Sequence, residues 1–467
     1  MRKEPNIDKK YMRENGMISK RFLNDGKPGI YLNSVQRNAL YHFTDWMESK
    51  EIQFETYPCE CGCKQEQLIP IAEKDRYGIA VSTKICPKCG LIMTNPRMKQ
   101  ENYNKFYDTL YRQLYVGRSI ASEEYYNIQC KRGKDILEYL QMYVNIDNVQ
   151  SVLEIGCSSG GIVSVFKNYG IAKCKGIDLG SEYIQYGQSK GLDLKIGSSD
   201  KLVESGEKYD LIIINHVLEH FLDIRKELLM IKELLTENGM VYISVPGVFN
   251  LQSVYGNDFL KYLQNAHIRH FCRGTLQQIM AWNGFEEICG DEEVRGIYKK
   301  GCVCKKIMKN YYHPEMDYLN DLENDNIKEI YIAPINTEAQ KAGYNIEILN
   351  QWLMLARKGK RVSYVLEEKQ INNIAIYGGG ILGRQLYEEL ADSSIKVMYF
   401  IDRNKNVKIK KLKTYTLNEA LPQTEAIVIA TSNEYTAISH AIRTIGGGVK
   451  ILTIQDLLNE MVTTKTK

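Results

Sequence analysis

The stretch Val152–Gly161, which reads VLEIGCSSGG, decides the fold of this chain. Its first residues read as a buried strand, the glycines that follow as a tight turn, and its end as the first turn of a helix. Small residues let the backbone approach a ligand closely, and a helix N-terminus offers unpaired N–H groups. The stretch therefore predicts a strand–turn–helix unit that holds a ligand.

Two later strands extend this prediction. The run Lys175–Asp178 ends in an acid, at the distance expected for a carboxylate that binds ribose hydroxyls. The run Tyr209–Asn215 leads directly into His216–His220, which reads HVLEH. Helical patterns separate the strands, so we expect an α/β fold with a parallel, doubly wound sheet and ligands at the carboxyl ends of its strands.

These stretches resemble the class I S-adenosylmethionine methyltransferases, whose turn reads Glu/Asp-x-Gly-x-Gly-x-Gly. The resemblance implies S-adenosylmethionine as methyl donor. The residues it implies for donor binding are Glu154, Gly156, Ser158, Gly160, Asp178, Ser198 and Asp200. Ser198 stands where the family usually has an acid, and Asp200 is the alternative contact. The other interpretation is a dinucleotide-binding Rossmann unit, against which Glu154 and the replacement of the middle glycine by Ser158 both argue.

The composition is that of a globular protein. The 467 residues are enough for two to four domains, with 44% hydrophobic and 25% charged residues. The net charge of +4 is spread along the chain and gives no case for nucleic acid or membrane binding. No apolar run has the length of a signal peptide core or a membrane span. We therefore expect a cytoplasmic protein whose cysteines are thiols or metal ligands.

Two short cysteine knuckles predict a structural zinc site. The first reads CECGC over residues 59–63 and the second CPKCG over residues 86–90, with two strand-like runs between them. A glycine follows both Cys61 and Cys89 and permits the turn, so the predicted ligands are Cys59, Cys61, Cys86 and Cys89, with Cys63 as the substitute. Four thiolates leave no open position, which favours a zinc ribbon over a catalytic metal.

This order of parts resembles the sugar C-methyltransferases of bacterial deoxysugar pathways, in which a zinc ribbon precedes a methyltransferase domain and a further α/β domain follows. The resemblance covers roughly Cys59–Lys300 and includes ICPKCGLIMTNPR at residues 85–97. That family carries a His-Glu-His…Tyr-Phe-Ser catalytic phrase after the last core strand. Here the corresponding stretch His267–Cys272 reads HIRHFC, so the layout is kept while C-methylation is in doubt.

Methyl transfer is an in-line displacement, in which the enzyme aligns the acceptor and removes its proton. The catalytic candidates at the rim of the sheet are His216, Glu219, His220, His267 and His270. Their spacing also resembles the Glu-x-x-Glu-His…His metal site of some small-RNA and quinone-biosynthesis O-methyltransferases. His216 replaces the first Glu, which weakens the case for magnesium. The remaining interpretation is that Glu219 and His220 only cap the following helix.

The C-terminal part contains a second glycine turn. Gly378, Gly380 and Gly383 follow a strand-like run, and the next strand ends at Asp402. Here the sequence resembles the nucleotide-binding domains of sugar-modifying enzymes in surface-polysaccharide pathways, which implies a diphosphate at the turn, from NAD or a nucleotide sugar. An empty scaffold for dimerisation or acceptor docking is the alternative.

The sequence thus predicts a methyltransferase that acts on a sugar, in free or nucleotide-linked form, or on another small metabolite, and that could form a homodimer. The alternative is a nucleotide-sugar or NAD-binding protein whose central domain is a degenerate scaffold. The expected parts are an N-terminal helical segment (1–55), a zinc ribbon (56–100), a helical cap (101–145), a methyltransferase domain (146–304), a linker (305–345) and a Rossmann-like nucleotide-binding domain (346–467).

Overall fold

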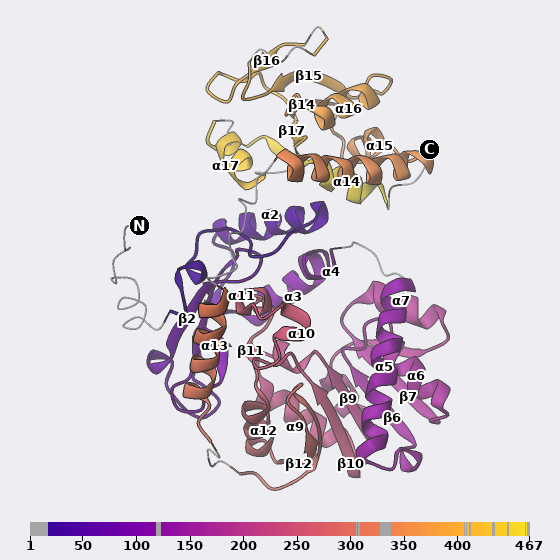
Figure 1. The fold of residues 1–467 in the computed structure, drawn as a ribbon. Coiled ribbons are helices and arrows are strands. Elements are labelled where there is room, and N and C mark those ends of the chain that lie inside the picture. The colour runs from indigo at the N-terminus through magenta and orange to yellow at the C-terminus, as the bar shows by residue number, and fades with distance from the viewer. Residues whose placement is uncertain are drawn as a thin grey trace, which may run out of the picture. The chain divides into compact units, whose positions relative to one another are not determined.

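The computed structural model describes residues 17–117, 123–304, 306, 309–326, 338–405, 407, 409–410, 412–431, 435–445, 448–462 and 464. The chain forms two compact units (Figure 1). Unit 1 takes the described residues of 1–30, 53–108 and 120–330, and unit 2 those of 31–52, 109–119 and 331–467. The N-terminal part of the chain is therefore shared between the two.

Unit 1 is built on a seven-stranded sheet in the order β12-β13-β10-β9-β6-β7-β8. Only β13 runs antiparallel to its neighbours. Its strands are β6 (Ser151–Ile155), β7 (Lys173–Asp178), β8 (Asp193–Ile196), β9 (Tyr209–Asn215), β10 (Leu235–Ser244), β12 (Phe285–Gly290) and β13 (Arg295–Lys300). All five residues of β6 are buried, as expected of a central parallel strand covered on both faces.

Helices cover both faces of this sheet (Figure 1). On one face α5 (Glu123–Tyr143) and α6 (Gly161–Tyr169) share a core with β6, β9, β10 and β13. The remaining helices of this domain are α7 (Ser181–Ser189), α8 (Ser199–Glu204), α9 (Ile224–Leu234), α10 (Gln252–Tyr255), α11 (Phe259–Tyr262) and α12 (Arg273–Trp282), with 3₁₀ turns η4 (Ile146–Asn148) and η5 (Leu218–His220). The parallel, doubly wound arrangement expected from the sequence is present.

The cysteine module, residues 56–98, is joined to this domain by a shared sheet in the order β11-β4-β3-β2. Its strands are β2 (Ile69–Lys74), β3 (Ala80–Ile85), β4 (Ile92–Thr94) and β11 (Arg269–His270), all antiparallel. The short strands β1 (Phe54–Glu55) and β5 (Arg97–Met98) pair nearby, and η1 (Lys20–Phe22), η2 (Gln65–Gln67) and α3 (Gln100–Phe106) complete this part. Because β11 lies far along the chain from the other three strands, the module does not form its sheet alone.

The segment predicted as a linker contains a helix instead. In α13 (Tyr312–Asn326), Leu319 is buried in a core with Ile71 of β2 and Ile85 of β3. The Arg21 guanidinium donates to the Glu323 carboxylate at 2.7 Å. The buried side chain of Leu319 and the Arg21–Glu323 ion pair hold this helix as part of unit 1.

Unit 2 is built on a five-stranded, all-parallel sheet in the order β16-β15-β14-β17-β18. The strands are β14 (Asn373–Tyr377), β15 (Lys396–Ile401), β16 (Thr414–Tyr415), β17 (Ala426–Ile429) and β18 (Lys450–Thr453). The helices are α2 (Ser34–Glu48), α4 (Arg112–Val116), α14 (Glu338–Arg357), α15 (Val362–Glu368), α16 (Ile381–Leu390), α17 (Tyr435–Ile445) and α18 (Ile454–Met461). The π-helical turn η3 (Tyr107–Tyr111) lies at the border of the two units.

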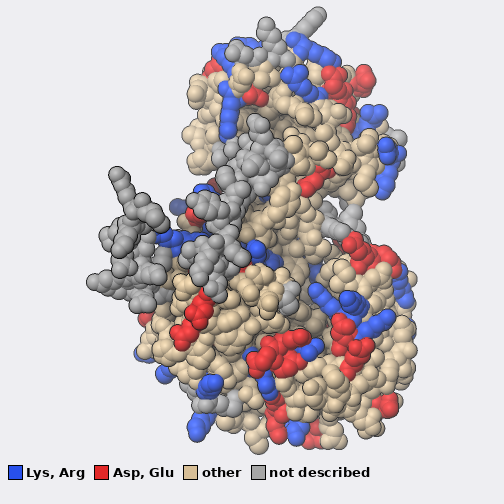
Figure 2. Space-filling view, in the orientation of Figure 1, with Lys and Arg blue, Asp and Glu red and all other residues tan. Residues whose placement is uncertain are grey.

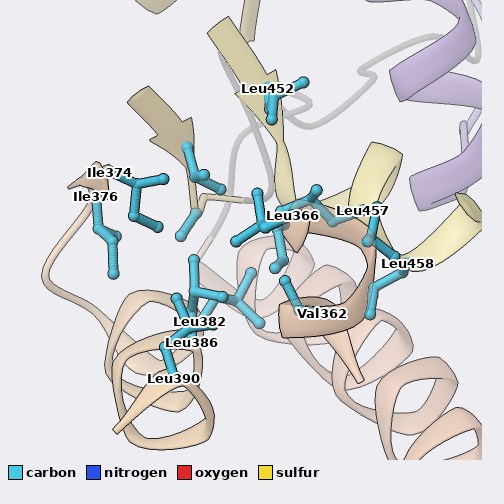
Figure 3. Packing of buried hydrophobic residues seen from close by; sticks show 14 of the residues in the cluster. Val362, Leu366, Ile374, Ile376, Leu382, Leu386, Leu390, Leu452, Leu457 and Leu458 are labelled. Atoms are coloured by element: carbon cyan, nitrogen blue, oxygen red, sulfur yellow. The ribbon is translucent and has the colours of Figure 1, made fainter. Parts of the chain in front are cut away.

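Alternate residues of β14 point to opposite faces of this sheet. Ile374 and Ile376 pack with α14, α15, α16 and α18, and Figure 3 shows labelled side chains of the last three helices gathered toward them. Ala375 and Tyr377 pack on the other face, with α17 and with Tyr41 of α2. This period of two gives unit 2 two apolar layers.

Helix α2 belongs to unit 2 and is not a separate N-terminal segment. The Tyr41 hydroxyl donates to Ser439 at 2.8 Å, and the Asn38 amide donates to Asp456 at the same distance. Helix α2 lies on the C-terminal sheet because its apolar side chains are buried there and its polar side chains form hydrogen bonds with unit 2. The predicted helical cap is also divided, because α4 packs on α2 whereas α5 packs on α6.

Within the described residues, no helix is long and apolar enough to cross a membrane. Figure 2 shows Lys and Arg residues interspersed with Asp and Glu residues over the viewed face. Among the described residues of that face, charges of both signs lie side by side.

Candidate functional site: a donor turn and a buried glutamate

The glycine turn of unit 1 follows β6 and is shaped by neighbouring side chains. Gly156 and Gly160 have φ angles of 75° and 76°, which favour glycine. A Cβ at Gly156 would stand 2.3 Å from Val217 Cγ2, and one at Gly160 would stand 2.8 Å from Leu194 Cδ1. From the sequence, small residues here are expected to let a ligand approach the backbone. The structure shows that these two glycines also make room for the side chains of Val217 and Leu194.

Asp178 ties the turn to the end of the next strand. Its two carboxylate oxygens accept hydrogen bonds from the backbone N–H of Ser158 at 2.8 Å and of Gly180 at 2.7 Å. Each carboxylate oxygen can accept more than one hydrogen bond, so this arrangement leaves capacity for ribose hydroxyls. The structure therefore places Asp178 beside the turn, in the position expected of a donor-binding residue.

The other predicted donor residues lie around the same turn. Glu154 is buried and accepts from the Val163 N–H of α6 at 3.2 Å, and burial raises the pKa of its carboxyl well above the usual range. The Gly197 N–H donates to the Asp178 carbonyl at 3.1 Å, which brings the loop of Ser198 to Asp178. The Ser198 hydroxyl donates to Asp200, and both residues are exposed.

Glu219 is the centre of the chemistry-bearing side chains of unit 1. It is 1% exposed, and neither carboxylate oxygen has a hydrogen-bond partner among the described residues. Three imidazole nitrogens each lie 3.8 Å from Glu219 Oε1, namely His216 Nδ1, His220 Nε2 and His267 Nε2. Burial raises the pKa of Glu219 to about 8.

This cluster adjoins the glycine turn of unit 1. His216 directly follows β9, and its N–H donates to the Ser244 carbonyl of β10 at 2.8 Å. Its φ angle is 56°, an uncommon backbone conformation for a residue other than glycine. The next residue, Val217, is the side chain that occupies the space above Gly156. The histidine–glutamate turn is thus packed directly on the glycine turn.

The orientation of His220 is fixed by its backbone partner. Its Nδ1 lies 2.9 Å from the Ala266 carbonyl and 2.9 Å from the Tyr107 hydroxyl. A carbonyl oxygen only accepts hydrogen bonds, so the proton lies on Nδ1 and the lone pair of Nε2 faces Glu219. His220 is therefore arranged to receive a proton from the direction of Glu219.

His267 and His270 differ in their distance from Glu219. His267 Nε2 contacts the Gln264 side-chain amide and faces Glu219, and burial lowers the pKa of this histidine well below its usual value. His270 lies behind it, with ring centroids 5.7 Å apart, and burial lowers the pKa of His270 to about 3. Of the four predicted catalytic histidines, the structure brings three to Glu219 and leaves His270 one ring farther away.

Sequence reasoning missed several residues of this site. Tyr103, Tyr107, Tyr111 and Tyr115 recur at helical spacing, a pattern typical of packing, yet the Tyr107 hydroxyl lies 2.9 Å from His220 Nδ1. Gln264, which contacts His267, and Arg76, which donates to the Gln264 side-chain oxygen at 3.1 Å, were not singled out. Only the helical spacing of tyrosines was a usable signal, because the other contacts join segments far apart in the chain.

The cysteine module brings four thiols together. The ligand atoms of Cys59, Cys61, Cys86 and Cys89 all lie within 4.8 Å of one another. The Cys59–Cys89 and Cys61–Cys86 Sγ distances are 3.5 and 3.6 Å, close to the separation of about 3.8 Å that tetrahedral Zn–S bonds of about 2.3 Å imply. Cys63 lies outside this group, with its thiol on the Gln67 side-chain oxygen.

The glycine turn of unit 2 repeats the arrangement of the first. Asp402 Oδ2 accepts from the Gly379 N–H at 2.7 Å. Gly383 lies so close to the Gly378 carbonyl that a Cβ would stand 1.9 Å from its oxygen. In contrast, no described atom lies within 4 Å of the position that a Cβ at Gly380 would take. Open space therefore remains at the start of α16.

Three kinds of comparison relate this chain to known proteins, and the first of them falls within unit 1. A family model described as a methyltransferase domain matches residues 127–289. A curated relative, the ribosomal protein L11 methyltransferase of Dictyoglomus thermophilum, is 29% identical over 112 residues, which are 23% of this chain and 35% of the relative. The match thus spans about a third of that relative's length.

Solved structures with low overall similarity include two methyltransferases. One is an S-adenosylmethionine-dependent methyltransferase from Archaeoglobus fulgidus, at 18% identity and a TM-score of 0.29, covering 44% of this chain and 88% of that one. The other is the plantazolicin methyltransferase BpumL in complex with SAH, at 14% identity and a TM-score of 0.31, covering 44% and 84%.

The glycine turn after β6, Asp178 at the end of β7 and the strands β6 to β10 all lie within the residues matched by the family model. Residues 127–289 of this chain are therefore similar to a methyltransferase domain.

Proposed function

We propose that this methyltransferase transfers the methyl group of S-adenosylmethionine to a sugar, free or nucleotide-linked, with Glu219 as the base. The supporting observation is the unpartnered carboxylate of Glu219, buried beside the donor turn and faced by three imidazoles. Burying a carboxyl without a hydrogen-bond partner is costly, and such groups with a raised pKa cluster at catalytic sites. The acceptor must be one whose reacting group has to lose a proton, as a sugar hydroxyl does.

In the proposed reaction, the acceptor oxygen attacks the methyl carbon of the donor. The carbon–sulfur bond breaks, its electron pair stays on sulfur, and S-adenosylhomocysteine leaves. The acceptor proton passes to Glu219, whose carboxylate faces the lone pair of His220 Nε2. A positive sulfonium at the neighbouring turn favours the ionised form of Glu219, and therefore its action as a base.

A nucleotide-linked acceptor gives a role to unit 2, which we propose to be a Rossmann-like nucleotide-binding domain. The open space at Gly380 lies at the N-terminus of the ten-residue helix α16, where backbone N–H groups favour a diphosphate. Gly378, Gly383 and Asp402 shape this turn. The same turn also suits the diphosphate of NAD, so the ligand of unit 2 is a separate question for experiment.

The test is a methyl-transfer assay with labelled S-adenosylmethionine and a panel of acceptors, read by product mass. The panel contains nucleotide-linked sugars, the corresponding free sugars, and a ribosomal protein as the macromolecular alternative. We expect labelled product from a sugar and none from the protein. Methylation of the protein alone would refute the sugar proposal.

We propose that the four clustered thiols bind a structural zinc ion. The ligands are Cys59, Cys61, Cys86 and Cys89. Soft thiolate ligands in a tetrahedral set are typical of such sites. Metal analysis should find about one zinc per chain, and the zinc should be lost in Cys86→Ser. Cys63→Ser is the matched control and should keep it; loss of zinc in Cys63→Ser but not in Cys59→Ser would show that the ligand set is wrong.

A further inference from the structure

The cysteine module contacts the turn that carries Glu219 and His220. Glu60, which lies between the first two clustered cysteines, accepts from Arg269 Nε at 3.0 Å. The same guanidinium donates through Nη1 to the Phe221 carbonyl at 2.6 Å, directly after η5. Arg269 is 2% exposed, so its position is determined by these partners.

A second arginine holds the same backbone. Arg97 of β5 donates from Nη1 to the Leu222 carbonyl at 2.5 Å and from Nε to Glu55 at 2.9 Å. Both guanidinium groups lie over the ring of Tyr57, at 3.9 Å for Arg97 and 5.8 Å for Arg269. Charge-assisted hydrogen bonds of this kind are among the stronger contacts that fix a backbone segment.

The other side of the cluster is held by the same module. The Thr94 hydroxyl donates to the His267 carbonyl at 2.8 Å, and the Thr94 N–H donates to the Ile268 carbonyl at 3.0 Å. The Ile268 N–H in turn donates to the Glu219 carbonyl at 2.8 Å. The backbone of both His267 and Glu219 is therefore connected to β4, only a few residues beyond Cys89.

We propose that Arg269 and Arg97 are positioning residues, through which the four-cysteine cluster holds Glu219 and His220 in their places for the reaction. Glu60 links the cluster to Arg269, and Arg269 links it to the turn. This inference rests on the proposed role of Glu219 as the base. It gives the cysteine module a function in methyl transfer beyond the stability of its own fold.

The experiment follows the imidazole nitrogens by NMR in the full chain, together with steady-state kinetics and S-adenosylhomocysteine affinity. The chain has seven histidines, so the signals of His220 and His267 can be assigned by substitution. Removal of zinc by a chelator should shift both signals and leave the donor affinity within about twofold. Because a displacement of the base by about 1 Å costs about 100-fold in rate, zinc removal should lower kcat by about 100-fold.

Arg269→Lys keeps the charge but cannot reach Glu60 and the carbonyl together. With zinc bound, this variant should shift the His220 signal and lower kcat. Removal of zinc from the variant should then cause little further change in the signal or in kcat. Because Arg269 is buried, its substitution could disturb folding, so the milder Glu60→Gln serves as the second variant. It should change the His220 signal and kcat in the same direction. Lys232→Met is the matched control, since Lys232 bridges the Gly284 and Gly301 carbonyls at 2.8 and 3.2 Å elsewhere in this domain.

Unchanged His220 and His267 signals after zinc loss would overturn the inference. So would an Arg269→Lys enzyme that behaves like Lys232→Met. Failure of every sugar acceptor contradicts the proposed function instead, because the NMR shifts and the donor affinity need no acceptor.

Discussion

The two glycine turns of this protein have the same local geometry and different surroundings. In each, an aspartate at the end of the next strand or directly after it accepts a hydrogen bond from the turn, at 2.8 Å for Asp178 and 2.7 Å for Asp402. In unit 1 the neighbouring strand β9 continues into the turn of His216 and Glu219, whose Val217 packs on Gly156. In unit 2 the corresponding strand β17 continues into Ala430 and Thr431, and neither of these two described residues has a titratable side chain.

The difference teaches that a glycine turn specifies a place for a ligand, and that the neighbouring strand specifies the chemistry. Both turns present a helix N-terminus, and both are tied by a carboxylate. Among the described residues, only the first lies beside a buried acid with three imidazoles around it. Four measurements test this difference between the two turns.

The largest effect is expected from Glu219→Gln. Loss of the base should lower kcat by about 10²–10⁴-fold, the usual contribution of general base catalysis, with unchanged S-adenosylhomocysteine affinity. Lys232→Met, which lies outside both glycine turns, is the control and should keep full activity. A Glu219→Gln enzyme with near-normal kcat would show that the buried acid is structural.

Asp178→Ala should weaken S-adenosylhomocysteine binding by at least about 100-fold, because a hydrogen bond to a charged group contributes about 1.5–3 kcal/mol and two ribose contacts are lost. Calorimetric titration measures this directly. Asp402→Ala, the equivalent change in unit 2, should leave that affinity unchanged. If both variants bind S-adenosylhomocysteine equally, the donor site has been assigned to the wrong residue.

The pH profile tests the same base without a mutation. Burial raises the pKa of Glu219 to about 8, so below that pH the carboxyl is protonated and cannot accept the acceptor's proton. We expect kcat/KM to rise about tenfold per pH unit below pH 8 and to level off above it. The Glu219→Gln enzyme should lack this rise, and a wild-type profile that is flat from pH 6 to pH 9 would contradict the assignment.

The smallest effect is expected at Gly380. Gly380→Val places a side chain in the open space where a diphosphate would lie, and should raise KM for a nucleotide-linked acceptor about tenfold, the loss of one hydrogen bond to a charged group. The donor affinity should stay the same. For contrast, Gly156→Ala creates a clash with Val217, so it should lower the free energy of unfolding by about 1–3 kcal/mol. Unchanged kinetics in Gly380→Val would indicate a scaffold role for unit 2.

Deleting unit 2 is a poorer test of acceptor docking than Gly380→Val. A chain ending near Ile346 keeps α2 but removes the sheet on which Tyr41 packs and the Asp456 carboxylate that Asn38 and His42 contact. An exposed apolar helix face favours association. Loss of activity after such a truncation would therefore not separate acceptor docking from aggregation, whereas Gly380→Val does.

The sequence by itself determined the features that depend on neighbours in the chain. A strand followed by glycines, an acid at the end of the next strand and cysteines one or two residues apart are local patterns, and the structure has the turn, Asp178 and the four clustered thiols where these patterns predict them. Glycine turns and knuckles follow from backbone sterics over a few residues, so short-range reasoning is sufficient.

Only the tertiary structure decided what surrounds Glu219 and where α2 lies. Tyr107 reaches His220 across 113 residues of chain, Glu60 reaches Arg269 across 209, and His42 reaches Asp456 across 414. No local propensity encodes such pairs, because they depend on which apolar faces are buried together. Candidate side chains of the site could therefore be named from the sequence, whereas the residues that hold them in place depended on packing between distant segments.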